Sequence, residues 1–178
     1  QYRPAASDRG TEETFSPVKA RFLRMTIHES RGSARMDELE VWTATEPSRN
    51  VSLASLGATA VARATRTDNG DSTIYSVDNL IDGTFNKRWI SGEGARGQVT
   101  IRLGQEETIS RLFWSRDRTG SFQGKYAGSF PTKYEIEVSL DGESWKKVTD
   151  SFDRLPTREQ DVKELLFQAV LTADEKVE

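Results

Sequence analysis

Cysteine is absent from this 178-residue sequence, and histidine occurs only once, at His28. Without cysteine the chain can form neither a disulfide framework nor a thiolate metal site. A Ser-His-Asp triad would have to use His28, yet the sequence has no G-x-S-x-G nucleophile elbow to accompany it. Paired carboxylates for glycoside hydrolysis are the one catalytic arrangement that counting leaves open, because acids are abundant. We predict that the chain is not an enzyme and that His28 is an ordinary strand-end residue.

Long hydrophobic runs and an excess of one charge are also missing. No apolar run approaches the length of a membrane span. The net charge is -3 with both signs mixed, whereas a nucleic-acid footprint needs clustered Lys and Arg. The first ten residues lack the apolar region of a signal peptide, so we expect none there, and whether Gln1 follows a removed leader stays open. We therefore expect no nucleic-acid partner and no membrane-spanning segment.

What the chain does contain is a series of short segments with alternating polarity. In residues 22–27, Leu23, Met25 and Ile27 share one face, which is typical of a half-buried strand. Similar patterns predict further strands at 37–42, 98–103, 108–115, 134–139 and 145–148. Many short strands without alternating helices predict an all-β sandwich of two sheets. Residues 1–17 carry no periodicity and are predicted to form a polar N-terminal arm.

The period of the pattern changes after Pro156. Apolar residues then recur at helical spacing, at Val162, Leu165, Leu166 and Val170. Pro156 and the threonine after it make a plausible helix start. We predict a helical C-terminal extension over residues 156–178.

Four segments together resemble a known family. They are NVSLASLGATA at 50–60, NLIDGTFNKRW at 79–89, QVTIRLG at 98–104 and YEIEVSLDGESW at 134–145. In this order they resemble the opening strand, the Asp-Gly loop and two later strands of discoidin domains, also called coagulation factor V/VIII type C domains. The resemblance implies a two-sheet jelly-roll β-sandwich of the galactose-binding-like type.

One departure from the family concerns the closing strands, which normally come last but here occupy residues 20–42. The domain is either circularly permuted, or residues 1–45 end a preceding copy. We favour permutation because domain termini usually lie close together, and because a missing strand would leave an open sheet edge. The connector 43–49 of about 7 residues can span about 23–25 Å. We therefore predict one sandwich over residues 18–155.

The resemblance also implies a structural calcium ion near the Asp-Gly loop. Asp82 matches the family's carboxylate ligand, Thr84 and Asn86 occupy loop positions that supply further oxygens, and Glu38 matches a second carboxylate. Calcium prefers several hard oxygen ligands of this kind. Lys87 departs from the family, which often has Thr or Ser there. The alternative interpretation is an Asp-Gly turn that holds no ion.

The long loop 116–130 is the candidate ligand site, because the family binds glycans, and less often lipid or protein, with loops at one end. Aromatic faces beside planar hydrogen-bonding groups suit sugars. The predicted ligand-binding residues are Arg116, Asp117, Arg118, Phe122, Gln123, Lys125 and Tyr126. The alternative is a loop whose aromatic side chains only pack onto the sandwich.

By resemblance, the chain is a non-catalytic carbohydrate-binding or adhesion module of a larger secreted or cell-surface protein. That implies a glycan or protein ligand, neighbouring domains, and an extracellular, periplasmic or cell-surface location. The second hypothesis is a structural or protein-interaction accessory domain without a small ligand. A third is binding to a membrane surface, for which Phe122 and Phe130 beside Lys125 are thin support.

Overall fold

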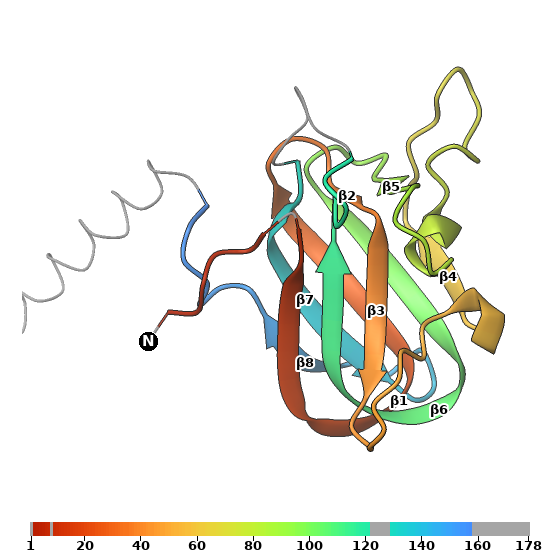
Figure 1. Cartoon of the computed structure of the whole chain (residues 1–178), viewed down its shortest axis with the longest axis vertical. Helices are drawn as coiled ribbons and strands as arrows, with labels where there is room; N and C mark the ends of the chain where they lie inside the picture. Colours follow the sequence, from red (N-terminus) through yellow and green to blue (C-terminus); the bar gives the residue numbers. More distant parts are fainter. Residues whose placement is uncertain (1, 8, 122–128, 158–178) are drawn as a thin grey trace, which may run out of the picture.

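The computed structural model describes residues 2–7, 9–121 and 129–157 (Figure 1). These residues form antiparallel strands and two short 3₁₀ turns, so the all-β prediction is confirmed. The strands are β1 (Thr11–Ser30), β2 (Arg35–Met36), β3 (Glu38–Thr43), β4 (Thr59–Ala62), β5 (Trp89–Ile90), β6 (Gly97–Ser115), β7 (Pro131–Ser139) and β8 (Lys146–Asp150). The 3₁₀ turns are η1 (Ala54–Leu56) and η2 (Val77–Leu80).

Two long strands, β1 and β6, run through both layers of the molecule. Residues 97–102 of β6 pair with residues 22–27 of β1, whereas residues 111–114 of β6 pair with residues 11–14 of β1. The first half of β6 also pairs with β4, and the second half pairs with β3. One layer is therefore ordered β4-β6-β1-β7-β8, and the other is β3-β6-β1. Figure 1 shows the second layer in front of the first.

Register shifts allow β1 to bend from one layer into the other. The pairing of β1 with β6 slips between Thr14 and Val18 and again between Ala20 and Phe22. Such bulges bend a strand and increase its twist. Because both long strands bend in this way, their first and last residues all lie at one end of the sandwich, which we call the loop end.

The core fills the space between the two layers. Trp114 of β6 meets Tyr134 of β7 edge to face, with 5.6 Å between ring centroids, and lies 6.3 Å from Phe130. Leu23 and Met25 of β1 are fully buried in the same cluster. The predicted inward faces of residues 22–27, 98–103 and 134–139 are the faces that the structure buries.

The N-terminal closing strand lies inside the sheet. Residues 22–27 pair with β6 on one side and with β7 on the other. β3 likewise pairs with the second half of β6. The front of the polypeptide therefore completes the sandwich made by residues 97–150.

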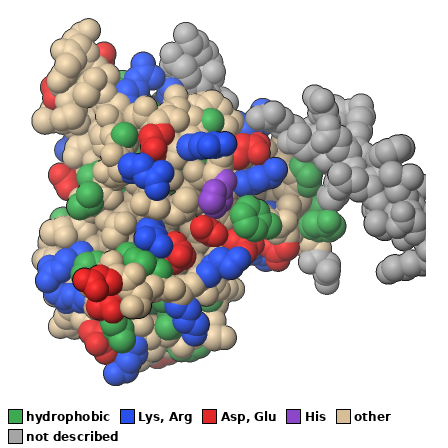
Figure 2. All heavy atoms as spheres, turned by 180° about the vertical axis from the view of Figure 1, so that it is seen from behind, with side chains coloured by type: hydrophobic (Ala, Val, Ile, Leu, Met, Phe, Trp, Pro, Cys, Tyr) green, Lys and Arg blue, Asp and Glu red, His purple; other side chains and the backbone are tan. Residues whose placement is uncertain are grey.

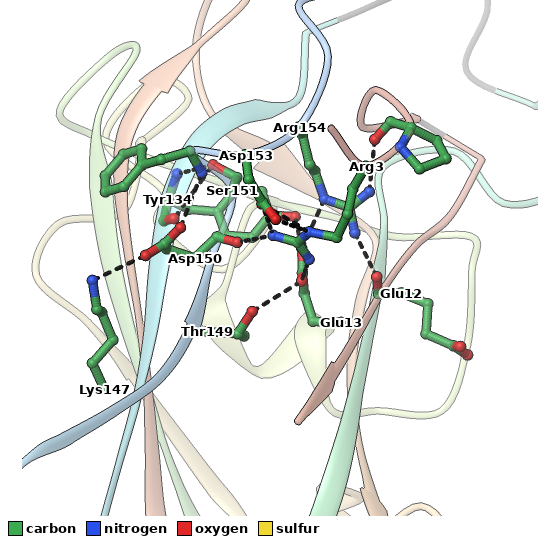
Figure 3. A network of polar contacts seen from close by, with 12 residues as sticks. Arg3, Glu12, Glu13, Tyr134, Lys147, Thr149, Asp150, Ser151, Asp153 and Arg154 are labelled. Atoms are coloured by element: carbon green, nitrogen blue, oxygen red, sulfur yellow. Dashed lines mark hydrogen bonds and ion pairs between the residues drawn. The ribbon is translucent and has the colours of Figure 1, made fainter. Parts of the chain in front are cut away.

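The prediction of a polar arm over residues 1–17 is wrong, because β1 begins at Thr11. The inward side chains of this half of the strand, Thr11 and Glu13, are polar, so no apolar alternation reveals it. Glu13 is fully buried and accepts hydrogen bonds from the Tyr134 hydroxyl and from the guanidinium groups of Arg3 and Arg154 (Figure 3).

These four side chains, together with Asp153, form what we call the terminal clasp. Arg3 also pairs with the Asp153 carboxylate, at 2.8 Å from Nε. The backbone N–H of Arg3 donates to Asp153 at 2.8 Å, and the N–H of Leu155 donates to Arg3 at 2.8 Å. The clasp therefore holds the two described ends of the chain side by side, as Figure 3 shows.

Two further expectations differ from the structure or lie outside it. Residues 98–103 and 108–115, predicted as two strands, belong to the single strand β6. The predicted helical extension falls almost wholly on residues 158–178, which lie outside the described residues; Pro156 and Thr157 are described and are not helical.

Candidate functional site

Glu38 is the most unusual residue at the loop end. It is 1% exposed, and among the described residues neither carboxylate oxygen accepts a hydrogen bond of normal geometry, although the Gly83 N–H approaches the carboxylate. Burial, reinforced by the charges of Asp82 and then Glu40, raises the pKa of Glu38 to about 9, although the Gly83 N–H and Arg118 oppose the shift. A buried carboxylate without a partner is costly unless it is protonated or neutralised by a cation.

The Asp-Gly loop, residues 82–86, lies close enough to Glu38 for this electrostatic effect. Its fold depends on Gly83, whose φ of +77° favours glycine. The Thr84 N–H donates to Asp82 Oδ1 at 2.7 Å, and the Thr84 hydroxyl lies 2.8 Å from both Asp82 Oδ1 and Asn86 Oδ1. Side-chain oxygens of three loop residues thus converge beside the buried carboxylate.

The structure therefore brings together the four residues predicted to hold calcium. No cluster of three or more His, Cys, Asp or Glu occurs among the described residues, so an all-carboxylate or imidazole site is absent there. Two carboxylates with amide and hydroxyl oxygens are instead a mixed oxygen set of the kind calcium uses. The buried oxygens of Glu38, which lack a hydrogen bond of normal geometry, are the kind of group that a hard cation would neutralise.

Arg118, predicted as a ligand contact, is folded over the outer face of β3 and β6. Its guanidinium lies between the rings of Phe85 and Phe113, at 4.2 and 4.4 Å from their centroids. Arg118 Nη1 donates to Glu40 at 2.6 Å, and Glu40 also accepts from Trp42. Because Phe85 belongs to the Asp-Gly loop, Arg118 connects that loop to the start of the loop 116–130.

Arg116 and Asp117 lie at the base of the predicted ligand loop. They are 1% and 2% exposed, and Arg116 Nη1 lies 3.3 Å from Asp117 Oδ2. Arg9 donates to the Asp117 carbonyl at 3.1 Å. Arg88 lies close by: burial lowers the pKa of Arg88, Arg116 adds to this, and Tyr75, Asp117 and Asp37 oppose it. Direct ligand contact by Arg116 and Asp117 stays a prediction, since their described positions are internal.

Four of the predicted ligand-binding residues, Phe122, Gln123, Lys125 and Tyr126, lie outside the described residues. At the other end of the same loop, Phe130 is buried against Trp114, and its carbonyl accepts from the Ser30 hydroxyl at 2.9 Å. For Phe130, the alternative that the loop aromatics pack onto the sandwich therefore holds.

Asp37 is a structural residue of this site that sequence reasoning missed. It is fully buried and accepts from the Ser115 hydroxyl and, at 2.8 Å, from the Arg118 N–H. Burial raises the pKa of Asp37 despite these hydrogen bonds. An acidic residue directly before the alternating residues of β3 is expected to face the solvent. Nothing in the sequence shows that a distant loop covers Asp37.

His28 lies away from these carboxylates, at the end of β1. Its imidazole Nε2 is 3.5 Å from Glu135, and the side chain is 42% exposed. Figure 2 shows this residue on the opposite face of the molecule, among basic and acidic side chains. This arrangement matches the predicted strand-end histidine.

Comparison with known proteins gives one family. Residues 61–172 match the F5/8 type C domain, a span of more than half the chain that includes the Asp-Gly loop but not Glu38. No curated protein matches the chain. Among the described residues, no helix is long and apolar enough to cross a membrane.

Proposed function

Because the chain belongs to the F5/8 type C, or discoidin, domain family, we propose that it is a carbohydrate-binding module of a secreted or cell-surface protein. Members of this family are typically non-catalytic ligand-binding domains. The ligand would bind at the loop end, and the chain would act without a catalytic step. Neighbouring domains of the parent protein would supply any chemistry.

The observation that carries the proposal is the anchoring of the loop 116–130 at both of its bases. Asp37 and Arg9 hold its first residues, and Phe130 is fixed in the core at its end. Binding surfaces gain affinity when their supports are rigid, because less conformational entropy is lost on binding.

We also propose that Glu38, Asp82, Thr84 and Asn86 hold a structural calcium ion. When bound, the ion would neutralise two neighbouring carboxylates, of which Glu38 is buried without a partner. The same loop carries Phe85, which stacks on Arg118. Fixing the Asp-Gly loop would therefore also steady the start of the loop 116–130.

A glycan array followed by calorimetric titration tests the carbohydrate-binding function. We expect affinities for simple sugars near a Kd of about 1 mM, the weak end of specific binding. Tyr126→Ala should lose this binding, whereas Tyr2→Ala, at an exposed position near the terminal clasp, should retain it. Absence of binding to every glycan on the array would contradict the proposal.

The second candidate is a protein-interaction module, and exposed apolar side chains near the terminal clasp favour it. Tyr2, Phe152 and Leu155 are 52%, 54% and 44% exposed. Exposed apolar side chains that come from the two neighbouring chain ends suit contact with another domain. A longer parent fragment in which all three become protected from hydrogen exchange or labelling, with no glycan binding, would favour this candidate.

A further inference from the structure

Two adjacent hollows at the loop end are lined by residues that do not belong to the loop 116–130. They flank the turn formed by residues 91–97, between β5 and β6. The first is lined by Thr26, Ile27, His28, Arg63, Glu93, Arg96 and Gly97. The second is lined by Ser33, Thr65, Arg66, Thr67, Ser91, Gly92 and Gly94.

The hollows carry more positive than negative charge. Three arginines line them, and Glu93 is the one carboxylate among the described lining residues. Arg63 Nη1 lies 3.6 Å from Glu93 Oε1, and the Arg63 side chain is 58% exposed. Arg66 and Arg96 are exposed, and no described residue makes a hydrogen bond or ion pair with either guanidinium.

The turn between the hollows is held rigidly. The Ala34 N–H donates to Gly94 at 2.7 Å, the Ser91 N–H donates to Ala34 at 2.9 Å, and the Gly92 N–H donates to the Ala64 carbonyl at 3.2 Å. A Cβ atom at Gly97 would lie 2.9 Å from the Trp89 ring, so close packing also fixes this position. The arginines therefore project from a framework that does not have to be ordered by a ligand.

The chemistry of the lining distinguishes between classes of sugar. Neutral sugars are commonly held by an aromatic face, and none of the described residues lining the two hollows is Phe, Tyr or Trp. Hydroxyl groups of Ser33, Thr65 and Thr67 suit sugar hydroxyls. Guanidinium groups pair with carboxylate and sulfate oxygens through two parallel hydrogen bonds.

We propose that the two hollows bind an acidic glycan, a chain of sugars bearing carboxylate or sulfate groups, across the turn 91–97. This inference rests on the proposed carbohydrate-binding function and names its ligand class. The protein as a whole carries a net charge of -3, so long-range attraction of polyanions is not expected. The affinity must come from the local arginines and will fall as salt rises.

Binding of the whole chain to four probes tests the inference: polygalacturonate, uncharged galactan, anionic phospholipid vesicles and a single-stranded oligonucleotide. We expect binding to polygalacturonate that weakens on raising the ionic strength. The double variant R66Q/R96Q should weaken it at least about tenfold, the loss expected from one charged hydrogen bond.

The matched control is R21Q/R102Q, which removes the same charge from two strand positions whose guanidiniums have no described partner. It should bind within about twofold of the wild type, because screened charges far from the ligand contribute little. Both variants are checked for wild-type melting temperature, so that a loss of fold is not read as a loss of binding.

Several results would overturn the inference. Galactan binding as tight as polygalacturonate binding would refute the acidic class while leaving the carbohydrate-binding function in place. Equal binding to vesicles or to the oligonucleotide would show a general anion surface instead. Unchanged binding of polygalacturonate by R66Q/R96Q would show that the polysaccharide does not bind at the two hollows. If neither polysaccharide bound, the result would count against both the inference and a polysaccharide-binding function.

Discussion

At the scale of single residues, Glu38 links the metal site to stability. In the metal-free protein, burial and the neighbouring Asp82 raise the pKa of Glu38 to about 9 from the ordinary 4.5. The folded state then holds this proton more tightly than the unfolded state does. Its contribution to stability is complete below the unfolded pKa and is lost as the pH rises toward the folded pKa.

We therefore predict that the melting temperature in a calcium chelator falls between about pH 5 and about pH 9. Added calcium should raise it, and the increase should grow with pH because the carboxylate must be deprotonated to bind the ion. Calorimetric melts with chelator and with calcium measure both effects. A calcium response that is absent, or that shrinks as the pH rises, would contradict the assignment.

The variant Glu38→Gln separates the two roles of this side chain. In chelator near pH 8, we expect it to melt at a higher temperature than the wild type, since a glutamine does not have to take up a proton when the chain folds. In calcium it should lose the stabilisation by the ion. Glu106→Gln, at an exposed residue paired with Lys19, is the control and should change neither value. A Glu38→Gln protein with a full calcium response would show that the ion binds elsewhere.

Glu13 is the second residue whose environment makes a strong prediction. It is fully buried and paired with Arg3 and Arg154, so Glu13→Gln leaves the nearly buried Arg154 without its counter-charge and Arg3 with Asp153 alone. We expect a loss of about 3 kcal/mol in the free energy of unfolding, as for other broken buried pairs. Glu12→Gln, which breaks an exposed pair with Arg111, should cost less than about 1 kcal/mol. Urea unfolding of both variants measures the difference, and equal losses would contradict the clasp.

At the scale of strands, the sequence predicts those whose inward residues are apolar. Residues 22–27 and 134–139 alternate clearly because each has one face in the core. The first half of β1 escaped prediction because the polar residues Thr11 and Glu13 occupy its inward positions, and the Arg154 partner of Glu13 lies 141 residues away along the chain. Hydrophobic periodicity cannot reveal a strand that buries a hydrogen-bonded polar network.

Deletion of residues 1–17 tests whether this half-strand belongs to the fold. The deletion removes the pairing of residues 11–14 with β6 and both Arg3 and Glu13 of the clasp. We expect a protein without a cooperative unfolding transition, because the layer β3-β6-β1 would lose a strand and expose its core. Circular dichroism during heating shows this. A truncated protein that melts like the full chain would mean that these residues are only an appendage.

At the scale of the whole molecule, the candidate sites share the loop end because β1 and β6 each start there, bend at the opposite end of the sandwich and return. The resemblance to discoidin domains supplied Asp82, Thr84, Asn86 and Glu38, and the structure brings them together. It could not supply the two hollows, whose lining comes from segments near residues 26–33, 63–67 and 91–97. Their proximity depends on strand order and turn shape, which no single segment of the sequence encodes.

The measurement that tests the account most directly is nuclear magnetic resonance of the labelled chain titrated with an acidic oligosaccharide. If the loop end is the ligand surface, amide signals of residues 63–67 and 91–97 should shift progressively, while those of residues 18–20 and 107–109, which pair at the opposite end of the sandwich, stay in place. An absence of shifts at saturating sugar, or shifts confined to residues 18–20 and 107–109, would contradict a glycan-binding loop end.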